Sequence, residues 1–183
     1  MTASNVKVAT NGLCYVAPLG TALPAAYDDT LNVAFVDLGE VSEDGLERAY
    51  ETSSEAVRNW RRQPIRNLTT EVTATFKLTF LETNEATVNA YFGSEVATNA
   101  GGGSKITVGQ PSNEQQALVI SLEDSAFGET TLVVVPRVVA TEREAITDSA
   151  GDVTGYGVTF MAYYDATIDG LFEVYYPTDL TSA

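Results

Sequence analysis

The clearest pattern in the sequence is a strict alternation of polar and apolar residues from Glu71 to Phe80. Odd positions are polar and even positions are apolar, which is the period of a β-strand with one wet face and one buried face. The pattern therefore predicts a strand whose apolar side chains pack in a core. These side chains are Val72, Ala74, Phe76 and Leu78.

Other short runs rich in β-branched and aromatic residues cover much of the remaining chain, with turn-forming residues such as Asp44-Gly45 and Asp169-Gly170 between them. Pro136 inside one run predicts a bulge or an edge position, because proline cannot donate to a central ladder. Together the runs favour a mainly β fold, an antiparallel β-sandwich or barrel. The runs that predict strands are 13–16, 33–36, 117–120, 132–140, 158–164 and 171–176.

One segment, 83–92, has helical spacing instead. Thr83 is the expected N-cap, apolar residues follow at helical intervals up to Tyr91, and Gly93 closes the helix. A helix this short needs packing against a sheet to be stable. The glycine-rich stretch 97–104 predicts a flexible loop, and no Gly-Lys-Ser/Thr follows it to make a phosphate-binding loop. The expected organisation is a single domain over 1–183 with one short α-helix.

Composition excludes most enzyme mechanisms. The chain of 183 residues has no histidine and a single cysteine, Cys14, so it has no catalytic dyad or triad based on histidine and no imidazole metal ligand. Adjacent carboxylates, as in Glu43-Asp44, point to opposite faces of a strand and are better explained as solvated turns. We therefore expect no catalytic residue, no cofactor and no metal. No apolar run is long enough for a membrane helix and no signal peptide is evident, so a soluble protein is expected.

Charge is unevenly distributed along the chain. Ten basic residues stand against twenty-five acidic ones, for a formal charge of −15. Four of the ten basic residues lie between positions 58 and 66, around Trp60. This cluster has two interpretations: a solvated basic loop, or a docking element for the acidic surface of a second copy. Trp60 could stack on single-stranded nucleic acid, but a lone tryptophan is more often a core or interface anchor.

The order of several motifs resembles the major tail tube proteins of long-tailed bacteriophages. The resemblance covers roughly 13–93 and rests on the order of the motifs, since each is degenerate alone; segments 132–142, 157–164 and 175–177 fit more loosely. The motifs are Leu13–Pro24, Phe35–Gly45, Trp60 with Pro64-Ile65-Arg66, the strand 70–81, Glu82-Thr83-Asn84 before the helix, and Tyr91-Phe92-Gly93 at its end.

The resemblance implies a non-enzymatic structural protein of the virion tail, assembled in the bacterial host cytoplasm. Its copies would form hexameric rings, close their sheets into one ring-shaped barrel, and stack into a tube through which phage DNA leaves. An N-terminal arm and loop (1–43) and a long hairpin (about 44–70) would reach neighbouring subunits. The implied partners are other copies and tail proteins such as the tape measure, terminator and distal tail proteins, with no membrane partner.

The resemblance also implies two sets of site residues. One set would lie at the interface between stacked rings, on the hairpin: Arg58, Trp60, Arg61, Arg62 and Arg66. The other would face the lumen, on the wet face of the alternating strand: Glu71, Thr73, Thr75, Lys77 and Thr79. An acidic lumen would let DNA slide, because like charges repel the phosphates.

Two other classes of function remain as alternatives. A β-sandwich adhesion or surface-binding module is compatible with the threonine content and the single cysteine, but such modules normally carry a signal peptide. A hydrolase that uses only carboxylates needs two convergent carboxylates, which the sequence does not visibly supply.

Overall fold

The computed structural model describes residues 7–178 and 180, so the first six positions of the expected N-terminal arm lie outside the described residues. The described chain forms ten strands and one helix, α1 (Glu85–Phe92). The strands are β1 (Asn11–Pro18), β2 (Val36–Asp37), β3 (Glu47–Arg58), β4 (Pro64–Phe80), β5 (Val96–Thr98), β6 (Ser104–Ile106), β7 (Gln116–Asp124), β8 (Glu129–Arg143), β9 (Tyr156–Ala162) and β10 (Glu173–Tyr175).

Eight of these strands belong to one antiparallel sheet in the order β2-β1-β7-β8-β9-β4-β3, with β10 paired to β8. The mainly β, antiparallel fold with one short helix is thus confirmed. Over residues 7–178 the sheet does not close into a barrel, so a sandwich or barrel stays a prediction. The glycine-rich stretch contains the turn of a separate hairpin formed by β5 and β6.

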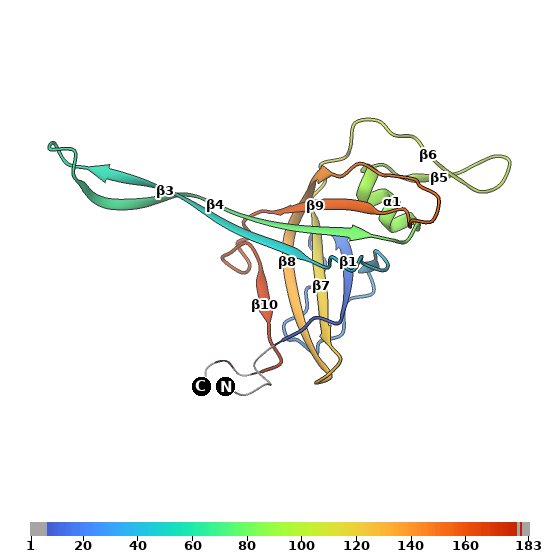
Figure 1. Ribbon diagram of the computed structural model, residues 1–183, viewed down its shortest axis with the longest axis horizontal. Coiled ribbons are helices and arrows are strands. Elements are labelled where there is room, and N and C mark those ends of the chain that lie inside the picture. Colours follow the sequence, from blue (N-terminus) through green and yellow to red (C-terminus); the bar gives the residue numbers. More distant parts are fainter. Residues whose placement is uncertain (1–6, 179, 181–183) are drawn as a thin grey trace.

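Strand β8 joins the two parts of the sheet. Its first half pairs with β7 and β10, and its second half pairs with β9. At the change of partner, Pro136 and Arg137 lie opposite the single residue Ala117, which is the bulge predicted from the proline. In Figure 1, β7 and β8 run down the body, whereas β9 and β4 run across it.

The main core lies between these two parts of the sheet. Phe76 and Phe80 of β4 pack in one cluster with Ile120 of β7 and Val133 of β8. Ala74, Phe76 and Leu78 are buried as predicted. Val72 is 41% exposed, which contradicts the prediction. Strand β9 pairs with β4 only from Thr75 onward, so Val72 lies on the part of β4 that is paired to β3 alone among the described strands.

A second, smaller cluster lies on the other face of β7 and β8, where the segment between β1 and β2 covers Val119 and Val134. Phe35 packs into this cluster from an irregular segment, so the predicted strand 33–36 is wrong except for its last residue. The reason is local: Asn32 accepts the backbone N–H groups of Ala34 and Phe35, which bends the chain away from a ladder.

Helix α1 covers the main core through Ala86, Ala90 and Tyr91. Its N-cap is Asn84, whose Oδ1 accepts the backbone N–H of Thr87 at 2.8 Å, so the prediction of Thr83 is wrong by one residue. The Thr83 hydroxyl is instead 3.0 Å from the hydroxyl of Tyr156. Gly93 ends the helix as predicted, with φ of 63° and with Pro111 so close that a Cβ would lie 2.8 Å from it.

Candidate assembly surfaces

The outer part of the β3–β4 hairpin, residues 51–72, projects from the body and is called the arm here (Figure 1). All its residues are exposed except Ala56 and Asn59, which are half-buried. The arm nevertheless carries large apolar side chains, including Ile65 and Leu68 at 65% and 42% exposure. A two-stranded hairpin without a core of its own is marginally stable. Several large apolar side chains exposed on one projecting element are typical of a surface that another protein covers.

The tip of the arm is ordered by its own hydrogen bonds. Oδ1 of Asn59 accepts the backbone N–H groups of Arg61 and Gln63, both at 2.9 Å. Arg62, with φ of 61°, takes the left-handed conformation that this turn requires. Because the turn is held in this way, the tip keeps one shape before it meets a partner, and less conformational entropy is lost on binding.

All five residues predicted for the ring-stacking interface lie at this tip or just behind it. Trp60 is fully exposed, so a role as a core anchor is excluded. Within the described part of the chain, none of the four arginines is in an ion pair. The span 58–66 contains four arginines and no carboxylate, so the tip is a concentrated positive charge on an acidic protein.

The predicted lumen-facing residues share the face of β4 opposite the core. Thr73, Thr75, Lys77 and Thr79 are half-buried and alternate with the buried Ala74, Phe76, Leu78 and Phe80, while Glu71 is exposed. Cross-strand pairing adds acidic residues to the same face, since Glu47 is opposite Lys77 and Glu51 is opposite Thr73. Sequence reasoning missed these two glutamates because it treated β4 alone; the pairing register of the hairpin was the signal that could have found them.

Lys77 is the one basic residue among the predicted lumen-facing side chains, and it is neutralised locally. Its Nζ lies 2.7 Å from Oε1 of Glu144. This hydrogen bond, with further charge from Glu144 and Glu47, raises the pKa of the lysine. The face consequently remains acidic overall, with Glu51, Glu71 and Glu142 adding to it.

Among the described residues, strand β3 leaves one edge of the large sheet unpaired. It is the last strand in the sheet order, and it is twelve residues long. The first half of β4 is paired to β3 alone among the described strands. Long open edges are templates for pairing with another chain, and natural monomers usually shorten or block them.

Over residues 7–178 and 180, no group of three or more potential metal ligands lies close enough together to hold an ion. No helix in that part of the chain is long and apolar enough to cross a membrane. Cys14 is fully buried in the core, and its burial raises the pKa of the thiol. A projecting arm, open strand edges and a charged tip are together typical of a structural subunit that assembles with other chains.

The sequence model for phage tail tube proteins matches residues 1–182. The chain therefore belongs to the phage tail tube protein family and is a structural component of the virion tail. This membership favours a structural role over the adhesion module and over the carboxylate hydrolase.

Two solved structures to which this chain is similar come from contractile injection systems. A chain of the extracellular contractile injection system PVC, from its sheath–tube complex in the extended state, aligns with a TM-score of 0.50 and 12% identity, over 96% of this chain and 99% of that chain. A chain of the anti-feeding prophage baseplate aligns with a TM-score of 0.49 and 13% identity, over 95% and 97%. No curated protein sequence matches this one.

Proposed function

We propose that six copies of this protein close into a ring, that the rings stack into the tail tube, and that the tube conducts the phage genome. The observation that carries the proposal is the arm. It has no partner within its own described chain, and it presents apolar and positively charged side chains to the outside. Contact with a copy in the next ring would bury both.

The open edges of β3 and β4 support closure of the ring. Lateral pairing between copies would satisfy the free backbone groups, and closing a ring of strands removes every edge. The similar PVC chain comes from a sheath–tube complex. Six-fold symmetry is the family's expected value for the ring.

The polar face of β4 supports a lumen lining. Glu71, Thr73, Thr75, Lys77 and Thr79 would then point into the channel, joined by Glu47 and Glu51 from β3. Short hydroxyl side chains and uncompensated carboxylates offer phosphate groups little to bind. DNA would pass without adhering to the wall.

A tube inside a phage tail would contact other tail proteins at its two ends and in its lumen. The two ends of the tube would meet a terminator and the distal tail proteins, and the lumen would hold the tape measure before the genome passes. None of these roles requires a catalytic residue, a cofactor or a metal. Assembly would occur in the cytoplasm of the bacterial host.

Electron microscopy of the purified protein tests the proposal. We expect rings or tubes whose end-on averages have six-fold symmetry. A protein that stays monomeric at high concentration, with no rings even when other tail components are added, contradicts the proposal. Rings with another symmetry contradict the number of six copies per ring but leave the proposed tube standing.

A further inference from the structure

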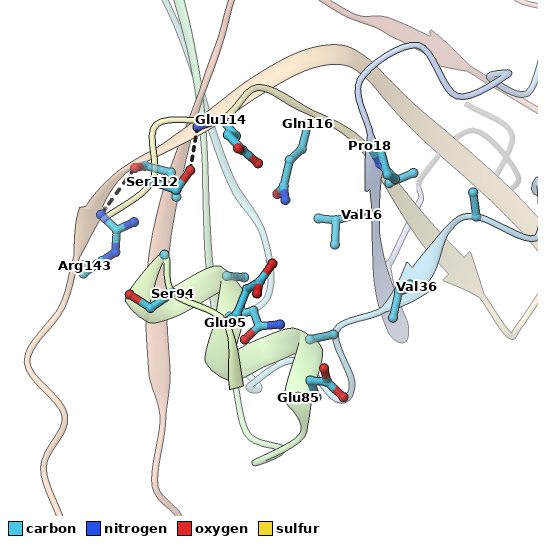
Figure 2. A pocket seen from close by; sticks show the side chains of 17 residues that line it. Val16, Pro18, Val36, Glu85, Ser94, Glu95, Ser112, Glu114, Gln116 and Arg143 are labelled. Carbon is cyan, nitrogen blue, oxygen red and sulfur yellow. Dashed lines mark hydrogen bonds between the residues drawn. The ribbon is translucent and has the colours of Figure 1, made fainter. Parts of the chain in front are cut away.

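A groove of about 530 Å³ lies on the body, between α1 and the neighbouring ends of β1, β2 and β7 (Figure 2). Its apolar lining includes Val16 and Val36 on one side and Ala86 and Ala90 of α1 on the other. Val36 is 53% exposed. A volume in this range accommodates a group the size of an aromatic side chain with its neighbours.

Three carboxylates surround this apolar lining. Glu85 is in the first turn of α1, Glu95 follows the helix, and Glu114 precedes β7. Figure 2 shows Glu114 on one side of the groove, Glu95 and Glu85 beside α1, and Val16 on the side of β1. All three are exposed, and within the described chain none is in an ion pair. The one lining arginine, Arg143, donates to the backbone carbonyls of Tyr91 and Ala140 instead.

We infer that this groove receives the tip of the arm of another copy, with Trp60 on the apolar lining and the tip arginines facing the three glutamates. The inference rests on the proposed function and names the surface that the arm binds. Its basis is complementarity: the arm offers an exposed indole among unpaired arginines, and the groove offers an apolar surface among unpaired carboxylates.

The tip cannot occupy the groove of its own chain, because the arm points away from the body on the side opposite α1 (Figure 1). From Glu51 to Trp60 the arm spans about 30 Å at ~3.3 Å per residue. A tip and a groove on different parts of one molecule make a head-to-tail contact. Such contacts do not stop at a pair: they either close into a ring or continue as an open stack of subunits.

Crosslinking within assembled tubes tests the inference directly. The variant carries Arg61→Cys and Glu95→Cys, and it is treated with a short bismaleimide; Cys14, fully buried, does not compete. We expect a ladder of covalent multimers on denaturing gels. The matched control, Arg61→Cys with Glu123→Cys, should stay monomeric on the gel. Its second site is on β7, roughly 24 Å along the strand from Gln116 in the groove lining.

Tubes that form but give no ladder overturn the inference and leave the proposed function standing. Absence of rings and tubes from the unmodified chain contradicts both. If the cysteine variant itself does not assemble, a charge exchange decides. Arg61→Glu with Arg62→Glu, and separately Glu95→Lys with Glu114→Lys, should each raise the concentration at which tubes form by about tenfold or more.

The four charge changes combined in one chain should restore assembly, because the reversed tip then faces a reversed groove. A structural defect in either pair would not be repaired by the other pair. A combined variant no better than the worse of the two pairs overturns the inference.

Discussion

The side chain of Phe76, on β4, packs in the main core between the two parts of the sheet. It is 1% exposed, and its ring packs edge-to-face on Phe172 at 5.3 Å between centroids. We expect Phe76→Ala to lower the free energy of unfolding by ~3–5 kcal/mol, because it removes a large buried ring and leaves a cavity. Urea denaturation measures the loss. Thr75→Ser, on the opposite face of β4, is the control and should change little; equal effects of the two variants would contradict the assignment of faces.

Asp165 links the loop after β9 to Arg137 in the bulge of β8. Its Oδ1 accepts the backbone N–H of Thr167 at 2.8 Å, and its Oδ2 lies 3.2 Å from Nη2 of Arg137. The hydrogen bond from Thr167, more than the arginine, lowers the pKa of the carboxyl below its ordinary value of 3.8. The folded state therefore favours the ionised form.

The sign of the pH dependence follows from that shift. Ionised Asp165 stabilises the fold above the pKa of the unfolded chain, and this contribution is lost as the pH falls below about 4. We expect Asp165→Asn to be less stable than the unmodified protein at pH 7, with a difference that shrinks toward pH 3. Urea midpoints at a series of pH values measure it. A constant difference across that range would mean that the charge of Asp165 does not matter.

At the scale of elements, the arm separates folding from assembly. Trp60 is fully exposed and packs against no core of its own subunit in the described part of the chain. We expect Trp60→Ala to melt like the unmodified protein and yet to form no tubes, because truncating an interface aromatic costs ~2 kcal/mol or more per contact and the contact repeats along the tube. Thermal melting followed by microscopy distinguishes the two effects. If Trp60→Ala forms tubes of normal length, Trp60 is not part of the interface between subunits.

Assembly should tolerate the loss of any single arginine of the tip, although it should depend on the four arginines together. An exposed ion pair contributes only ~0–1 kcal/mol, so we expect Arg62→Ala to assemble almost normally. Raising the salt concentration should weaken stacking of the unmodified protein, because charges are screened over ~8–10 Å at physiological ionic strength. Light scattering at a series of salt concentrations measures the extent of assembly. Assembly that is indifferent to salt would leave the arginines as a solvated cluster.

At the scale of the whole molecule, the acidic character of the tube wall has a consequence for DNA. We expect Thr73→Lys with Thr75→Lys to leave tubes intact and to create DNA binding that falls steeply with salt. Thr73→Gln with Thr75→Gln is the uncharged control of similar length. Filter binding to purified tubes and the rate of genome delivery measure the effect. If the genome is delivered at the normal rate with lysine at both positions, the side chains at 73 and 75 do not face the channel.

The sequence by itself determined the features that depend on neighbouring residues. The alternation in β4 gives the buried Ala74, Phe76 and Leu78, because side chains on a strand point to opposite faces whatever the strand packs against. Pro136 produces its bulge because it lacks an N–H, and Gly93 ends the helix because it tolerates a positive φ. These are local constraints, and a single sequence carries them.

Only the tertiary structure decided what lies beside each element. Val72 continues the apolar pattern but is exposed, because its burial depends on where β9 ends and not on β4 itself. Glu47 and Glu51 join the polar face of β4 through the pairing register of the hairpin, which the alternation within either strand leaves open. The groove brings Glu85, Glu95 and Glu114 together from separate segments of the chain. Their shared environment depends on contacts between distant segments, and these form only when the sheet and α1 pack.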